Sequence, residues 1–87
     1  MLRVSLADKV HNVRSLLFDY RAEGEELWRR FDPESDQLWY YRSLSNLYSR
    51  RSKSRLAHEL ERLVAELEEV ALIGALQTLV AYGRRGD

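Results

Sequence analysis

The apolar residues of this chain recur at steps of three and four positions, the repeat expected along one face of an α-helix. The first such stripe consists of Leu6, Val10, Val13, Leu17 and Tyr20. A polar stripe with the same rhythm consists of Asp8, Asn12, Ser15 and Asp19. At about 100° per residue, the two stripes lie almost opposite each other. They predict an amphipathic helix from about Val4 to Arg21, with Ser5 as its cap and Asp8 completing a capping box.

Two more helices are predicted between residues 25 and 50. Gly24 can take the left-handed conformation that ends the first helix, and a short helix should follow over 25–31. Leu27, Trp28 and Phe31 are spaced to reach one side of this helix, which predicts that they are core residues. Asp32 as a cap with Pro33 at the first helical position predicts another helix, which should run to about Tyr48 or Arg50. We expect this helix at the centre of the core, through Trp39, Tyr40, Tyr41, Leu44, Leu47 and Tyr48.

The longest predicted helix begins at a Ser54 cap and ends near Tyr82, at Gly83. Its apolar stripe consists of Leu56, Leu60, Leu63, Leu67 and Val70. The register then shifts, and Ile73, Leu76 and Val80 carry the stripe onward while Gly74 interrupts the original line. About 28 residues at 1.5 Å each span about 42 Å, which outruns the shorter helices. The C-terminal half should therefore pack on another chain or kink near Gly74. Small residues that would let a partner helix approach are Ala71, Gly74, Ala75 and Thr78.

These elements predict an all-α protein of about four helices in one domain over residues 1–87, which forms a homo-oligomer through its long C-terminal helix. The 14 basic and 14 acidic residues balance, which argues against a general binder of nucleic acid or of anionic membranes. The absence of cysteine excludes a disulfide framework and a thiolate metal site. No signal-like segment and no apolar run of about 20 residues occur, so we expect a cytoplasmic protein that does not enter the membrane.

Candidate chemistry gathers on the first helix. Asp8 and Asn12 lie one turn apart with His11 beside them, so they can hold a metal ion or a phosphate, or simply face water. From the pattern alone, a ligand role and a capping role for Asp8 carry about equal weight. The basic segment 50–55 could bind a phosphate, but such a run is more often a solvated loop. His58 is expected at the surface.

The segment Ala7-Asp8-Lys9-Val10-His11-Asn12 resembles the distal motif of the HD-domain metal-dependent phosphohydrolases. The similarity is greatest to the branch that includes the guanosine tetra- and pentaphosphate hydrolases. Three later segments resemble those that follow this motif in small bacterial HD proteins, namely 19–24, 27–31 and 37–42. The resemblance runs from about Val4 to about Leu67. We therefore assign residues 1–70 to an HD-like part and residues 71–87 to a helix extension and tail.

The resemblance implies a partial HD-like helical arrangement and a metal site. The family builds this site from a His, an adjacent His-Asp pair and a distal Asp, and Asp8 matches the distal Asp. Asp8 would then ligate a divalent ion such as Mn²⁺, with Asn12 as a candidate catalytic residue beside it. The sequence contains no His-Asp dipeptide. The chain thus resembles the C-terminal part of an HD domain, and a truncated phosphohydrolase of this kind should be inactive or weak alone.

Three functions follow from these patterns. The first is the parent activity of the HD family, hydrolysis of a phosphate ester or of a nucleotide pyrophosphate linkage. The second is a helical self-association module that needs no metal. The third is half of a site that a partner chain completes with its own His-Asp motif.

Overall fold

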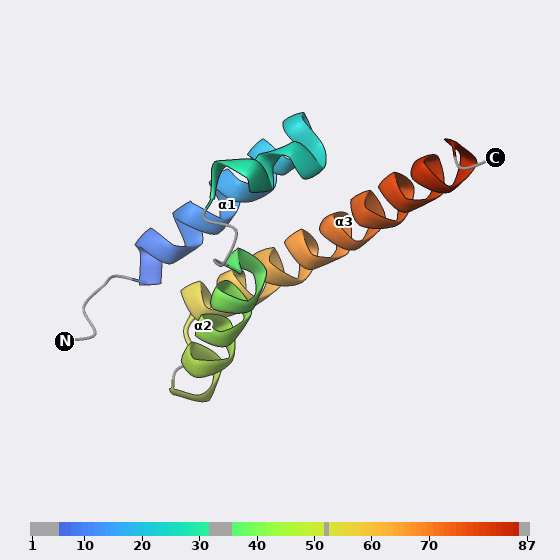
Figure 1. Ribbon diagram of the computed structural model, residues 1–87. Helices are drawn as coiled ribbons and strands as arrows, with labels where there is room; N and C mark the ends of the chain where they lie inside the picture. The colour runs from blue at the N-terminus through green and yellow to red at the C-terminus, as the bar shows by residue number, and fades with distance from the viewer. Residues whose placement is uncertain (1–5, 32–35, 52, 86–87) are drawn as a thin grey trace.

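A computed structural model describes residues 6–31, 36–51 and 53–85, with the side chains of 84 and 85 excepted. These residues form three α-helices, one 3₁₀-helix and no strand (Figure 1). In chain order they are α1 (Leu6–Glu23), η1 (Gly24–Arg30), α2 (Gln37–Arg51) and α3 (Arg55–Arg85). The prediction of an all-α fold is confirmed. The short second helix differs in being 3₁₀ rather than α.

The two stripes predicted for α1 are confirmed. Its apolar stripe faces the core, with Val13 fully buried and Val10, Leu17 and Tyr20 at most 5% exposed. The opposite positions Asp8, Asn12 and Ser15 are exposed. Burying a side chain such as Leu17 stabilises the fold by roughly 1.5–3 kcal/mol, which fixes the orientation of the helix.

The centre of the core lies between α1 and the first half of α3. The largest fully buried side chains there include Val13, Leu60, Val64 and Leu67. The prediction that 37–51 forms the centre is wrong, because among the described residues of α2 only Tyr41 and Ser45 are buried. The apolar residues of α2 spread around too much of the helix for one contact with α3 to cover them. Trp39 therefore stays 67% exposed.

The link from α1 to η1 is built as the sequence predicts. Gly24 has a φ of +68°, the left-handed conformation that L side chains disfavour. Leu27 of η1 is 1% exposed, and Phe31 packs against the core cluster. The ring of Trp28 lies 5.5 Å from that of Tyr20. Leu27 is thus a core residue, as predicted, and Trp28 and Phe31 are partly buried against the core.

The helix ends agree with the predictions only in part. Ser54 caps α3, since its Oγ accepts a hydrogen bond of 3.2 Å from the Ala57 amide. Asp36 caps α2 through a 3.0 Å bond from the Trp39 amide. The caps proposed at Ser5 and Asp32 lie outside the described residues. The predicted end at Gly83 is wrong, because α3 continues to Arg85. An apolar residue just beyond a helix-ending glycine often packs back on the helix, and the two residues that follow Gly83 in the sequence are both arginine.

The helix α3 runs without a break through Gly74. Its 31 residues span about 46 Å, and the molecule measures 52 × 22 × 20 Å. Both α1 and α2 pack on its first half, while its second half projects beyond them (Figure 1). The helix bounds thus show no interruption at Gly74, where a kink was one of the two alternatives expected for this half. No helix of the described residues is both long and apolar enough to cross a membrane.

Candidate functional site

The residues of the HD-like motif on α1 do not form a metal site within the described chain. Asp8, His11 and Asn12 are all exposed. No group of three or more His, Cys, Asp or Glu side chains in the described ranges could hold a metal ion. A catalytic metal normally needs about three protein ligands. The residues present therefore do not fit the implied divalent ion by themselves, and the role of Asp8 as a ligand stays a prediction.

Two residues of this motif contact α2 instead. Lys9 Nζ donates a 3.1 Å hydrogen bond to the Tyr40 hydroxyl and lies 5.4 Å from the centre of that ring. The hydrogen bond raises the pKa of Lys9. Asn12 forms a hydrogen bond with Tyr41, whose pKa is raised by burial and lowered less strongly by Lys9 and Asn12. Part of the motif thus serves packing between α1 and α2.

The basic linker and His58 form an exposed surface. Lys53, Ser54, Arg55 and His58 are all exposed. A hollow of about 310 Å³ beside them is lined by Ser49, Lys53, Ser54, Ala57, His58 and Glu61. Glu61 brings a negative charge to this hollow, which opposes the binding of a phosphate there. The arrangement agrees with a solvated loop, which is the interpretation that the sequence favours.

Ion pairs join the flanks of the helices. Arg14 donates a 2.9 Å bond to Glu59, and Arg21 pairs with Glu66 one heptad later on both helices. This spacing shows that α1 and α3 run parallel. Arg42 of α2 binds Glu68 through two nitrogens, at 3.0 and 2.7 Å. The hydrogen bonds to Glu68 raise the pKa of Arg42. These contacts hold both helices against the first half of α3.

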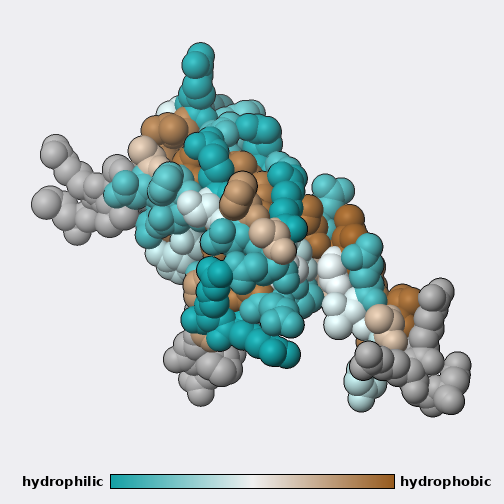
Figure 2. Space-filling view, turned by 90° about the horizontal axis from the view of Figure 1, so that it is seen from above, coloured by the Kyte–Doolittle hydropathy of each residue, from teal (hydrophilic) through white to brown (hydrophobic). Residues whose placement is uncertain are grey.

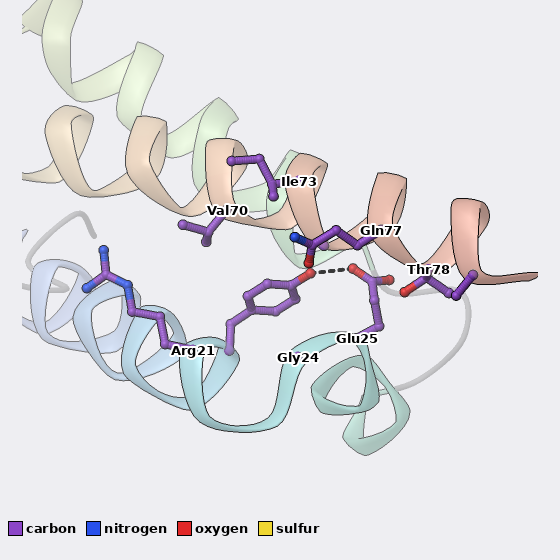
Figure 3. Close-up of a pocket in the computed structure, with 10 residues that line it drawn as sticks. Arg21, Gly24, Glu25, Val70, Ile73, Gln77 and Thr78 are labelled. Atoms are coloured by element: carbon purple, nitrogen blue, oxygen red, sulfur yellow. Dashed lines mark hydrogen bonds between the residues drawn. The ribbon is translucent and has the colours of Figure 1, made fainter.

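A groove lies where α1 turns into η1 beside the second half of α3 (Figure 3). Its volume is about 470 Å³, and it is lined by Tyr20, Arg21, Gly24, Glu25, Val70, Ile73, Gly74, Gln77, Thr78 and Ala81. The Tyr20 hydroxyl donates a 2.5 Å bond to Glu25, which Figure 3 marks by a dashed line. Burial and this carboxylate raise the pKa of Tyr20 to about 12. Burial and the hydrogen bond to Glu25 therefore hold the Tyr20 side chain in place at the bottom of the groove.

The second half of α3 carries the largest exposed apolar surface among the described residues. We name residues 72–83 the distal arm. Every residue from 75 to 83 is exposed, and the sequence from 70 to 83 contains no charged residue. The large apolar side chains and their exposed fractions are Leu72 61%, Ile73 48%, Leu76 52%, Leu79 66%, Val80 56% and Tyr82 77%. Figure 2 shows hydrophobic atoms along this projecting part of the molecule.

The apolar surface of the distal arm does not continue the core stripe of α3. At about 100° per residue, Leu76 and Val80 lie almost opposite Leu60 and Leu67, which are fully buried. Leu72 and Leu79 lie about 100–140° from those two residues around the helix. The core side of the arm carries the small residue Gly74 and the polar residue Thr78 instead. The sequence pattern predicts a shift of register after Val70, with Ile73, Leu76 and Val80 on the shifted stripe, but it does not predict Leu72 and Leu79 as part of this surface. The signal that could have revealed this surface is the stretch without charged residues. Such a stretch has no charged face that marks which side of the helix points to solvent.

The arm is also hollowed on its surface. A depression of about 520 Å³ is lined by Ile73, Leu76, Gln77, Val80 and Ala81. Such a depression between exposed side chains can receive a side chain of a facing helix.

Comparison of the chain with models of protein families, with curated proteins and with solved structures finds no match.

Proposed function

We propose that this chain is a helical self-association module that acts through the distal arm. The observation that carries the proposal is the run of nine exposed, uncharged helical residues from 75 to 83. Monomeric proteins rarely expose a large continuous apolar patch such as the one that Leu72, Leu76, Leu79 and Val80 form on the arm. The arm therefore resembles a helix that is buried against a second helix, but that second helix is not part of the described chain.

A second copy of the chain is the partner that fits the arm. The exposed residue Glu69 precedes the arm, and the sequence places Arg84 and Arg85 after it. The arm is thus apolar along its length and oppositely charged at its two ends. A surface of this kind is complementary to itself when a copy is turned end for end, and most homo-oligomers are built on such two-fold contacts.

The exposed apolar surface is large enough for an association of moderate strength. Covering the exposed half of Leu72, Leu76, Leu79 and Val80 would stabilise by roughly 1 kcal/mol for each side chain. Two copies together would then gain about 8 kcal/mol, whereas association costs about 4–15 kcal/mol. Gain and cost are of the same size, so self-association should depend on protein concentration rather than be permanent.

The mass of the chain in solution tests the proposal. Sedimentation velocity of the wild type should show a species heavier than the 10.3 kDa monomer as concentration rises. The double variant Leu76→Glu/Val80→Glu should sediment as a monomer, because a buried dimer contact would have to dehydrate four carboxylates. Ala65→Glu is the matched control, since Ala65 is exposed on the same side of α3 before the arm. A wild type that stays monomeric, or a double variant with unchanged mass, would refute self-association through the arm.

A metal-dependent phosphohydrolase whose site a partner chain completes is the second candidate. The observation that favours it is the exposure of Asp8 and His11 on α1, where a chain with a His-Asp pair could reach them. Its test is Mn²⁺-dependent hydrolysis of a panel of nucleotides that includes guanosine tetraphosphate, with Asp8→Ala as the control. Turnover that Asp8→Ala abolishes would support this candidate, and no turnover with any partner chain that carries a His-Asp motif would remove it.

A further inference from the structure

We infer that two copies pair their distal arms antiparallel, with the two-fold axis at Leu76. This inference rests on the proposed self-association and adds the direction and the register of the contact. Five of the six large apolar residues of the arm are placed symmetrically about Leu76, at Leu72, Ile73, Leu76, Leu79 and Val80, and the sixth, Tyr82, lies on another side of the helix. In an antiparallel pair centred there, Leu72 of one copy faces Val80 of the other, and Leu76 faces its own copy. Each large side chain of the set then meets another.

The direction follows from what lies before the arm on the same side of α3. The positions that precede it there include Glu61, Arg62 and Glu69, which are all exposed. In a parallel pair, the contact would run on from the arms into these residues and set each charge against its own copy. In an antiparallel pair, the two first halves of α3 point away from each other. The contact is then confined to the uncharged residues, as a dry helix pair requires.

The charges at the ends of the arm favour the same register. In an antiparallel pair centred on Leu76, position 69 lies opposite position 83, next to positions 84 and 85. The first of these is Glu69, which is exposed, and the last two are arginine in the sequence. A parallel pair would instead place Glu69 beside Glu69, which is repulsive. Opposite charges at both ends of the contact would steer the copies into the antiparallel arrangement.

Disulfide formation between single-cysteine variants tests direction and register, because the natural sequence has no cysteine. The variants are Leu72→Cys, Leu76→Cys and Val80→Cys, whose native side chains are all more than half exposed. Under mild oxidation, Leu76→Cys alone should form a covalent dimer. Leu72→Cys and Val80→Cys should each stay uncrosslinked alone, since two copies of either position lie about 12 Å apart along the axis. A mixture of these two variants should give the covalent heterodimer.

Each result separates the inference from the proposed function. Ala65→Cys serves as the control for random collision and should form no more covalent dimer than background. If Leu72→Cys and Val80→Cys each crosslink alone, the pair is parallel and the inference fails while self-association stands. If the wild type sediments as a dimer but none of the arm variants crosslinks above the Ala65→Cys control, the register is wrong. If the wild type remains a monomer, the proposed function and the inference fail together.

Discussion

A Cβ atom added at Gly74 would lie 2.0 Å from the hydroxyl oxygen of Tyr20 and 3.0 Å from its ring carbon Cζ. Tyr20 is only 5% exposed and its hydroxyl is tied to Glu25, so the ring cannot swing aside without losing core contacts. Gly74 is thus needed for α1 to approach α3 at this point. The close approach also explains why an apparent helix breaker lies inside an unbroken helix.

Gly74→Ala should destabilise the fold although alanine is the better helix former by roughly 1 kcal/mol. The clash with Tyr20 should cost about 1–3 kcal/mol, as overpacking of a core does. Thermal unfolding followed by circular dichroism measures the change. Gly83→Ala is the matched control, because a Cβ there meets nothing within 4 Å and should leave the protein equally stable or slightly more stable. A higher melting temperature for Gly74→Ala would contradict the close contact.

Ser45→Ala should stabilise the protein. Ser45 is 0% exposed, and within the described part of the chain its Oγ has no hydrogen-bond partner. Removing a buried, unsatisfied hydroxyl should gain about 1 kcal/mol. Ser43→Ala, two positions earlier in α2 and half-buried, reports the contribution of helix propensity alone. Urea unfolding of both variants measures the difference, and an equal gain in the two would show that burial of Ser45 has no cost.

The stability of the fold should fall in strong alkali because of Tyr20. Its pKa is about 12 in the folded chain, against 10.0 for an ordinary tyrosine. The folded state favours the neutral phenol, so this contribution is complete below pH 10 and is lost as the pH rises toward 12. A shift of this size corresponds to at most about 3 kcal/mol. We expect Tyr20→Phe to lose less stability than the wild type over this range in urea unfolding. Tyr82→Phe, at a position 77% exposed, should follow the wild type, and a slope for Tyr20→Phe equal to that of the wild type would rule out this explanation.

The chain alone should show no saturable binding of Mn²⁺. The described residues offer no group of three ligands, and a single exposed carboxylate such as that of Asp8 holds a divalent ion weakly. Isothermal titration with Mn²⁺ should give the same result for the wild type and for Asp8→Asn. Saturable binding that disappears in Asp8→Asn would show that a second copy or residues outside the described ranges complete a site.

The sequence predicts those parts of the fold that are decided within one helix. The stripe of Val10, Val13 and Leu17, the turn at Gly24 and the cap at Ser54 all depend on residues within a few positions of each other. Local spacing is therefore enough to find them. The end of α3 could not be found in this way, because a glycine such as Gly83 can adopt both helical and left-handed backbone.

The sequence predicts that the arm carries no charge, but not which side of the helix its large apolar residues occupy. A helical period can be read only while polar residues mark one side, and none of the residues from 70 to 83 is charged. Their orientation depends on the contact of Tyr20 with Gly74, which are 54 positions apart. The candidate site on α1 shows the same limit. Lys9 contacts Tyr40 of α2, a pairing over 31 positions that no local pattern reveals.

The unsupported length of α3 makes its order depend on association. Residues 75–83 are all exposed, and a short helix without packed neighbours is only marginally stable in water. In dilute solution the amide protons of this segment should exchange rapidly with solvent, while those of residues 57–71 stay protected by the core. At higher protein concentration a second copy of the chain would protect the same amides from exchange. The last turns of α3 would then fold and unfold with the local concentration of the chain, so that assembly and helix formation are one event.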